Sequence, residues 1–121
     1  RDLFELPAGK LDEGESTLAC GQRELFEETG YRATKWTYVA TIHPCIGYSD
    51  ESISLFLAQE LTEGSHQRDG DEFLEVFTLP MNQALDWVRV GRISDVKTVI
   101  GLFWAEKILQ GWQPPASPLS E

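Results

Sequence analysis

Apolar residues recur at helical spacing near the start of the chain. Between residues 17 and 28, Leu18 and Leu25 lie seven positions apart and share a side, while glutamates occupy another side. The pattern predicts a helix over residues 17–28. Ser16 is its expected N-cap, because its hydroxyl can accept from a free N–H group of the first turn. Gly30 is the expected left-handed residue at its end.

Runs of β-branched and aromatic residues predict the strands of a sheet. The sequence predicts four strands, at residues 2–6, 34–42, 52–59 and 73–79. Residues 43–51 contain Pro, Gly, Ser and Asp, so they are expected to form a loop. Residues 63–71 are polar and contain glycine, which indicates a second connection without regular structure.

Two helices are expected in the last third of the chain. The first covers residues 82–90 and ends at Gly91. The second begins after Ser94 or Asp95 as its cap and reaches about residue 110. Its apolar positions predict packing across a sheet: Val96, Val99, Ile100, Phe103, Trp104 and Leu109.

The order of these elements predicts an α/β fold with a mixed sheet covered by helices. The chain has 121 residues, enough for one small domain with one core. We expect this domain to cover residues 1–111. The proline-rich residues 112–121 are expected to form a flexible tail.

The composition of the chain disfavours several kinds of partner and location. A formal net charge of −10 disfavours nonspecific binding to nucleic acid. The sequence contains no run of about 18 apolar residues, so it predicts no membrane span. Cys20 and Cys45 have no metal-ligand spacing and form no disulfide framework, so a reducing cytoplasm is the expected location.

The candidate chemistry lies on the first predicted helix. Glu24 and Glu28 are four residues apart, so their carboxylates share one face, and Arg23 faces Glu27 in the same way. Carboxylate oxygens at this density suit a hard cation such as Mg²⁺, which takes few protein carboxylates and also binds substrate phosphates. A solvated acidic helix face would show the same spacing.

Residues 9–31 resemble the Nudix box, G-x5-E-x7-R-E-U-x-E-E-x-G-U, in which U is aliphatic. The matching positions are Gly9, Glu15, Arg23, Glu24, Leu25, Glu27, Glu28 and Gly30. Tyr31 departs from the aliphatic residue expected last, at a position that packs. The resemblance implies the Nudix α/β/α sandwich and a reaction in which Mg²⁺, or alternatively Mn²⁺, assists attack of water on a pyrophosphate.

The resemblance also implies roles for individual residues. Glu24 and Glu28 are the expected metal ligands, with Glu72 and the Ala8 carbonyl as further ligands. The expected catalytic residues are Glu27, Glu72, Asp71 and Arg23, and the expected substrate-binding residues are Gly9, Glu15 and Gly47. Arg23 is expected to orient a glutamate, such as Glu27 or Glu15, rather than to touch the substrate.

The sequence does not identify the general base. In the ADP-ribose pyrophosphatases a glutamate assigned as the base would fall on Gly70 of this chain. Asp71 and Asp69 are substitutes, and a neutral loop role competes for each. His43 and His66 could act as bases on pKa grounds, although loop or surface roles are expected for both.

Within the superfamily the chain resembles the ADP-ribose pyrophosphatases most. Residues 5–15 and 23–33 carry this resemblance, and the later segments HPCIGYSDESISLFLA and DGDEFLEV follow the order of that subgroup. Ile46 stands where the subgroup commonly has a second proline. The expected reaction converts ADP-ribose to AMP and ribose 5-phosphate. A segment before Arg1 and a homodimer of the full-length form are also expected.

Three alternatives compete with this interpretation. The substrate could be another nucleotide sugar, a dinucleotide or a damaged nucleotide. A Nudix-fold binding module without turnover is disfavoured because Glu15, Glu24, Glu27 and Glu28 are all present. A simple Ca²⁺-binding domain is disfavoured because no D-x-D-x-D-G loop is present.

Overall fold

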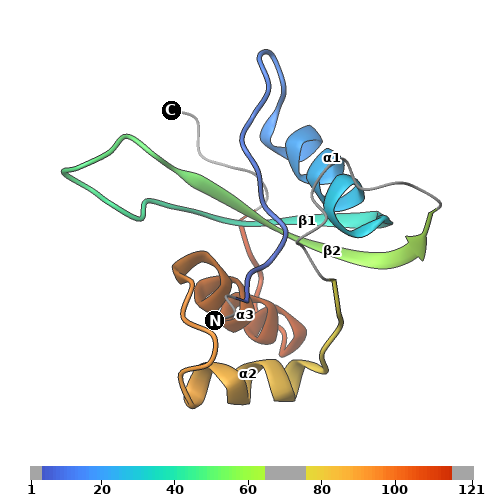
Figure 1. Ribbon diagram of the computed structural model, residues 1–121, viewed down its shortest axis with the longest axis vertical. Helices are drawn as coiled ribbons and strands as arrows, with labels where there is room; N and C mark the ends of the chain where they lie inside the picture. Colours follow the sequence, from blue (N-terminus) through green and yellow to red (C-terminus); the bar gives the residue numbers. More distant parts are fainter. Residues whose placement is uncertain (1–3, 65–75, 116–121) are drawn as a thin grey trace. The chain divides into compact units, whose positions relative to one another are not determined.

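The computed structural model describes residues 4–64 and 76–115 (Figure 1). In chain order its elements are α1 (Thr17–Thr29), β1 (Tyr31–Ile42), β2 (Ile53–Glu63), α2 (Met81–Arg89) and α3 (Val96–Leu109). Among the described residues, no helix has the length and apolar character needed to cross a membrane. The predicted cytoplasmic location stays a prediction.

Helix α1 forms where the sequence predicts it. The Ser16 side chain accepts a hydrogen bond from the Ala19 backbone N–H at 3.1 Å, so the predicted N-cap is confirmed. Gly30 has φ 80° and donates its N–H to the Phe26 carbonyl, which confirms the predicted left-handed end. The chain then enters β1 at Tyr31, three residues earlier than predicted.

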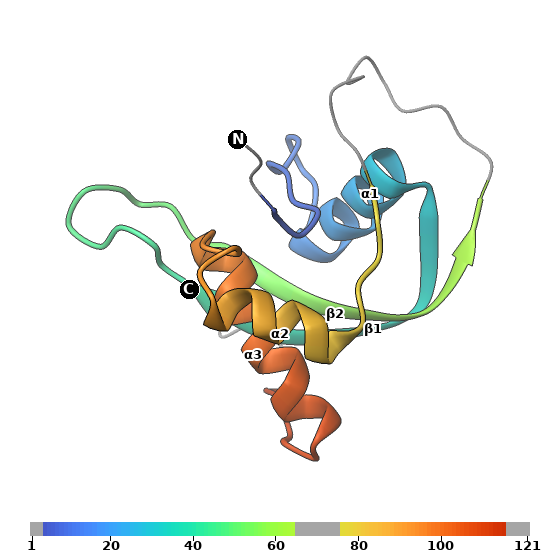
Figure 2. The ribbon, with the colours of Figure 1, turned by 60° about the horizontal axis from the view of Figure 1, so that its bottom comes forward.

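Strands β1 and β2 form an antiparallel pair joined by the predicted loop, and they run side by side in both views (Figure 1, Figure 2). The Thr34 hydroxyl donates to the Glu60 carboxylate at 2.6 Å, and the Thr41 and Ser54 hydroxyls are 3.3 Å apart. Residue numbers rise on one strand as they fall on the other, as an antiparallel register requires. Strand β2 extends to Glu63, beyond the predicted end at residue 59.

Two predicted strands are wrong in their described parts, although the α/β class holds. Residues 4–6 and 76–79 are not in strands, and the described sheet contains β1 and β2 alone rather than a mixed set of strands. The Leu6 backbone N–H donates to the Thr98 hydroxyl at 3.0 Å, so it bonds to helix α3 instead of a strand. Residues 2–3 and 73–75 lie outside the described residues, as does most of the predicted connection at residues 63–71.

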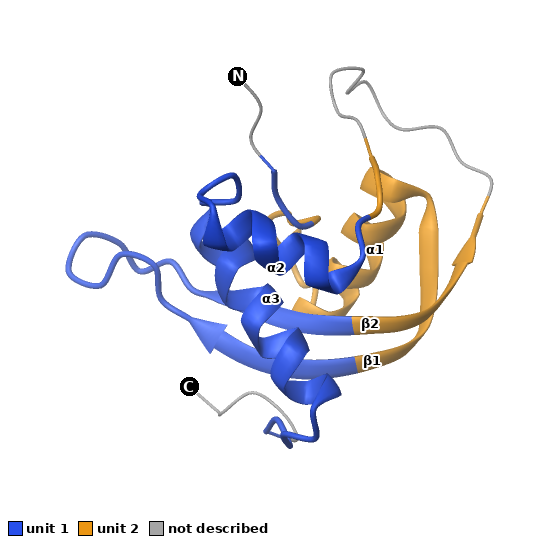
Figure 3. Cartoon of the chain, turned by 90° about the horizontal axis from the view of Figure 1, so that it is seen from below, with its two compact units in different colours: residues 1–6, 37–57, 79–121 blue, residues 7–36, 58–78 orange. Residues whose placement is uncertain are grey.

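The described chain divides into two compact units (Figure 3). Unit 1 contains residues 4–6, 37–57 and 79–115, and unit 2 contains residues 7–36, 58–64 and 76–78. In unit 1, Ala84, Ile93 and Leu102 form a buried apolar cluster. Phe4, Leu79, Met81, Leu85, Trp87, Val88 and Val99 pack against this cluster.

Helices α2 and α3 form close to the predicted positions, and Asp95 is the cap of α3 because its carboxylate accepts from the Thr98 N–H. The predicted packing face of α3 is wrong in part, since the side chains of Val96, Phe103 and Leu109 are 50%, 46% and 61% exposed. Residues of α3 that are buried instead are Thr98, Leu102 and Ala105. The apolar residues of α3 occupy all sides of the helix, so their spacing does not indicate which side packs.

The end of α3 is followed by an aromatic contact. The Trp104 and Trp112 rings meet edge to face with their centroids 5.8 Å apart, and the Trp112 N–H donates to the Lys107 carbonyl. Residues 116–121 lie outside the described residues. The predicted domain boundary after residue 111 therefore stays a prediction.

Candidate active site

Three side chains form one ridge on helix α1. Cys20, Glu24 and Glu28 are spaced four residues apart, which places them along a single row of the helix surface. Cys20 is buried, with 6% of its surface exposed, and the Glu24 side chain is 16% exposed. The ridge therefore starts with a small packed residue and continues with two carboxylates.

The segment 8–10 lies against this ridge. The Ala8 backbone N–H donates to Glu28 Oε1 at 3.3 Å, and the Cys20 thiol is 3.8 Å from the Gly9 carbonyl oxygen. Gly9 itself lies directly against the Glu24 side chain. These contacts bring the predicted metal ligands Glu24, Glu28 and Ala8 to one place in unit 2.

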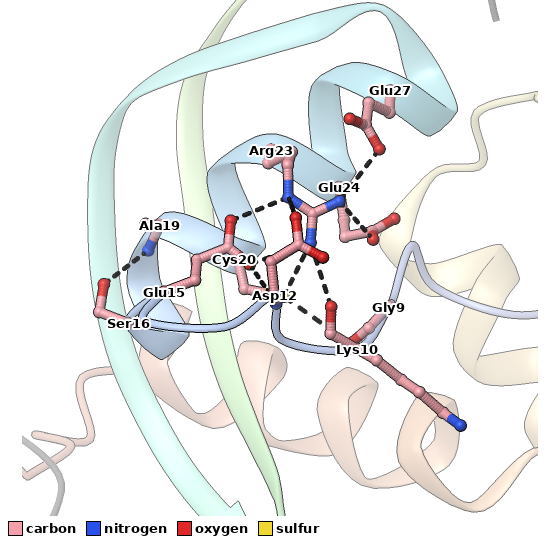
Figure 4. A network of polar contacts seen from close by, with 10 residues as sticks. All are labelled: Gly9, Lys10, Asp12, Glu15, Ser16, Ala19, Cys20, Arg23, Glu24 and Glu27. Carbon is pink, nitrogen blue, oxygen red and sulfur yellow. Dashed lines mark hydrogen bonds and ion pairs between the residues drawn. The ribbon is translucent and has the colours of Figure 1, made fainter. Parts of the chain in front are cut away.

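Arg23 is the centre of a polar network on the same helix (Figure 4). Its Nε and Nη2 atoms donate to the two carboxylate oxygens of Glu15 at 2.8 and 3.0 Å. Its Nη1 atom donates to Glu24 Oε2 at 3.0 Å and to Glu27 Oε1 at 3.2 Å. Nη2 also donates to the Lys10 carbonyl at 3.0 Å. The guanidinium is thus occupied by protein groups, as expected for a residue that orients glutamates.

The network contains more acid than base. One guanidinium contacts four carboxylates, those of Asp12, Glu15, Glu24 and Glu27. The Asp12 contact is the longest, at 3.5 Å, and its side chain is 72% exposed. Because one positive charge cannot balance four negative charges, the cluster keeps a negative potential that attracts cations.

The electrostatic coupling of Glu15 and Arg23 is strong. Hydrogen bonds from Arg23, followed by the one from the Asp12 backbone N–H, lower the pKa of Glu15 to about 2. The same Glu15 contact raises the pKa of Arg23. Both Glu15 oxygens are therefore held by the protein, and the predicted contact of Glu15 with substrate stays a prediction.

Cys20 lies beneath the segment 8–10 in a different electrostatic state. Burial, followed by the negative charge of Glu15, raises the pKa of the Cys20 thiol, so this cysteine stays protonated at neutral pH. Together with its burial, this describes Cys20 as a small packed residue of the helix.

The donor set fits a divalent cation of the Mg²⁺ type. Glu24 and Glu28 offer carboxylate oxygens, and Ala8, whose N–H bonds to Glu28, also carries a backbone carbonyl. Such hard oxygen ligands are those that Mg²⁺ prefers. Within residues 4–64 and 76–115, no three His, Cys, Asp or Glu side chains converge on one point. A set of two carboxylates completed by waters and substrate phosphate is consistent with that finding.

The remaining predicted site residues belong to unit 1 or fall outside the described residues. Gly47 has φ 92° and belongs to the exposed loop between β1 and β2, in unit 1, as does the exposed His43. The predicted residues of the acidic loop and the second histidine lie outside the described residues: His66, Asp69, Gly70, Asp71 and Glu72.

Sequence reasoning missed three participants in the site. The Lys10 carbonyl and the Asp12 carboxylate contact Arg23, and the Cys20 thiol contacts both Arg23 and Gly9. The four-residue spacing from Cys20 to Glu24 was the available signal for the last of these. No sequence pattern marks a backbone carbonyl as a partner.

Comparisons with known proteins identify the family. The sequence matches the NUDIX domain over residues 1–97. An ADP-ribose pyrophosphatase of Bacillus subtilis is 39% identical over 104 residues, which are 84% of this chain and 56% of the relative. A GDP-mannose pyrophosphatase of Cronobacter sakazakii is 39% identical over 102 residues, which are 81% of this chain and 52% of the relative.

A solved structure described as an ADP compounds hydrolase superposes with a TM-score of 0.74 at 27% identity. The match covers 84% of this chain and 55% of that structure. The chain therefore spans about half the length of the curated relatives and of the solved structure that it matches.

Proposed function

The chain belongs to the Nudix family, and from that premise we propose that it hydrolyses the pyrophosphate bond of a nucleoside diphosphate linked to another group. The proposed substrate is ADP-ribose, and the proposed products are AMP and ribose 5-phosphate. The proposed cofactor is Mg²⁺, with Mn²⁺ as a substitute.

One observation carries the proposal. The box residues Glu15, Arg23, Glu24 and Glu27 form a single hydrogen-bonded cluster, with more carboxylates than one arginine can neutralise. A pyrophosphate is itself an anion, so it can approach such a cluster only together with cations. The acidic excess therefore supports a metal-dependent reaction on a diphosphate.

The residues of α1 have separable proposed roles. Glu24 and Glu28 would hold the metal with the Ala8 carbonyl, and Arg23 keeps the Glu24 and Glu27 carboxylates in place. The cation, when bound, would neutralise charge on the diphosphate and make coordinated water more acidic. Glu27, whose side chain is 46% exposed, is the described carboxylate that we propose as proton acceptor.

The reaction balances with water alone. Water adds its oxygen to one phosphorus, the P–O bond to the bridging oxygen breaks, and the bridging oxygen leaves with the other phosphate. The proton lost by water passes to a carboxylate and then to solvent. Asp71 and Glu72 are competing proton acceptors that lie outside the described residues.

The predicted homodimer stays a prediction.

A second substrate is favoured by a specific observation. The relative described as a GDP-mannose pyrophosphatase has the same identity to this chain, 39%, as the relative described as an ADP-ribose pyrophosphatase. Both names describe a nucleoside diphosphate joined to a sugar. GDP-mannose hydrolysis to GMP and mannose 1-phosphate is therefore the second candidate function.

A paired assay tests the proposal. The purified chain is incubated with Mg²⁺ and either ADP-ribose or GDP-mannose, and nucleotide and sugar phosphate products are separated by ion-exchange chromatography. We expect a higher kcat/KM for ADP-ribose. A higher kcat/KM for GDP-mannose would replace the first candidate by the second, and no hydrolysis of either by a protein that binds Mg²⁺ would contradict both.

A further inference from the structure

Gly9 lies closer to helix α1 than a residue with a side chain could. A Cβ atom at this position would overlap the Cδ and Oε2 atoms of Glu24, and it would lie 2.6 Å from the Glu24 Cγ atom. Real Cβ atoms essentially never approach another heavy atom below 3.0 Å. Any substitution at Gly9 must therefore displace either the Glu24 side chain or the backbone of the segment 8–10.

Space, and not backbone torsion, is what separates glycine from alanine here. The described glycines with positive φ are Gly14, Gly30, Gly47, Gly91 and Gly111. Gly9 is not among them, so its backbone conformation is open to an L-amino acid. Alanine at position 9 would consequently act through its contact with Glu24 rather than through backbone strain.

The affected carboxylate is already fixed on its other side. Glu24 Oε2 accepts from Arg23 Nη1 at 3.0 Å, while the neighbouring Ala8 N–H donates to Glu28 at 3.3 Å. The bare backbone of Gly9 thus completes the place in which the Glu24 carboxylate lies (Figure 4). Oε2 is both the atom nearest to such a Cβ and the atom that Arg23 contacts, so displacing the carboxylate would also disturb that contact.

We propose that Gly9 is a positioning residue for the cation site. Its missing side chain lets the Glu24 carboxylate lie beside the segment 8–10, where it can share a divalent cation with Glu28. The inference rests on the proposed function, because it concerns the cation that the reaction would use. It replaces the predicted contact of Gly9 with substrate by an action through Glu24.

A double-mutant cycle tests the inference without measuring turnover. The variants are Gly9→Ala, Glu24→Ala and the double variant, since Glu24→Ala removes the three atoms that lie nearest to a Cβ at position 9. Gly101→Ala is the matched control, because its Cβ would lie 2.9 Å from Leu6 Cδ1 in unit 1, whereas the α1 ridge belongs to unit 2. Mn²⁺ binding is measured by electron paramagnetic resonance, and unfolding midpoints are measured in EDTA.

We expect Gly9→Ala to raise the Kd for Mn²⁺ by about tenfold or more, as for other groups that orient metal ligands. Gly101→Ala should leave this Kd unchanged. In EDTA, Gly9→Ala should lower the unfolding midpoint when Glu24 is present and should have no effect in the Glu24→Ala background. If Gly9→Ala alone does not fold, the double variant should fold as Glu24→Ala does.

Three results would overturn the inference: wild-type Mn²⁺ affinity in Gly9→Ala, an equal loss of midpoint in both backgrounds, or a double variant that unfolds where Glu24→Ala folds. A purely structural role of Gly9 predicts the second and third of these. If Mn²⁺ affinity and the unfolding midpoints change as expected but the wild-type protein hydrolyses no nucleotide sugar, the proposed function is wrong and the positioning role of Gly9 is retained.

Discussion

Two ionic clusters in this protein are built alike and differ in charge. In unit 2, Arg23 on α1 contacts four carboxylates and the carbonyl of Lys10. In unit 1, Lys97 on α3 contacts two carboxylates, those of Glu5 at 2.6 Å and Asp95 at 3.1 Å. Each cluster ties a segment near the start of the chain to a helix.

In the cluster of unit 1, Asp95 is committed to the fold. Asp95 accepts from both the backbone N–H and the hydroxyl of Thr98, and it also accepts from Lys97. Burial alone would raise the pKa of Asp95, but the hydrogen bonds from Thr98 and Lys97 lower it overall. This carboxylate is a helix cap with a charge partner, which is a structural role.

The cluster in unit 2 leaves the larger excess of negative charge, because four carboxylates contact Arg23 whereas two contact Lys97. Arg23 satisfies both oxygens of Glu15 but bonds only one oxygen each of Glu24 and Glu27. The comparison shows that a count of acidic residues does not identify a cation site. What distinguishes the candidate site is the larger excess of neighbouring carboxylates over cations.

The largest effect is expected from removing one charge on the α1 ridge. Glu24→Gln and Glu28→Gln should each lower kcat by about 100-fold or more, because several kcal/mol of charge stabilisation would be lost at 1.36 kcal/mol for each tenfold. The fold should be retained, since like charges at i and i+4 repel. Glu5→Gln in the other cluster is the control. Near-normal kcat for either ridge variant at ordinary Mg²⁺ would refute its assignment as a ligand.

A smaller loss of activity is expected when Arg23 is removed. Arg23→Ala should lower kcat by about tenfold or more, because Glu24 and Glu27 would lose the group that orients them. Arg23→Lys should restore only part of the activity, since an ammonium cannot bind Glu15 through two parallel hydrogen bonds. Steady-state kinetics at saturating Mg²⁺ provides the comparison. Full activity in Arg23→Ala would show that the network does not position the carboxylates.

The depressed pKa of Glu15 predicts a dependence of stability on pH. Its value of about 2 lies below the ordinary 4.5, so its contribution to stability is complete above pH 4.5 and is lost as the pH falls towards 2. Glu15→Gln should therefore unfold more easily than wild type at pH 7, and this difference should shrink between pH 4.5 and pH 2. Urea titrations across that range measure it, and a constant difference would contradict the coupling to Arg23.

The smallest effect is expected in unit 1. Lys97→Met should cost about 0.5–1 kcal/mol of stability, the scale of an ion pair that is partly exposed to solvent. It should leave kcat unchanged, because its contacts with Glu5 and Asp95 are structural. Urea unfolding and the hydrolysis assay are run on the same preparation. A loss of kcat as large as that of Arg23→Ala would remove the distinction between the two clusters.

Features set by neighbours along the chain could be predicted from the sequence. Helix α1 begins at the Ser16 cap and ends at left-handed Gly30, and both signals lie within a few residues of the helix. Arg23 and Glu27 meet because they are four residues apart on that helix. The core of the candidate site was predictable for the same reason.

Features set by distant partners could not be predicted. Residues 4–6 have a strand-like sequence, but the Leu6 N–H bonds to Thr98, 92 positions away. The buried side of α3 depends on its partners too, because apolar residues occupy all its sides. The closeness of Gly9 to Glu24 likewise follows from tertiary packing, and the box motif alone does not reveal it.

The most direct test of the cation site is the effect of Mg²⁺ on thermal unfolding. A ligand that binds only the folded state stabilises it, by about 2.7 kcal/mol at a concentration 100 times its Kd. The wild-type protein should therefore melt at a higher temperature in Mg²⁺ than in EDTA, and a variant with both Glu24→Gln and Glu28→Gln should show no such rise. Equal midpoints for the wild-type protein in EDTA and in saturating Mg²⁺ would contradict a cation site on the α1 ridge.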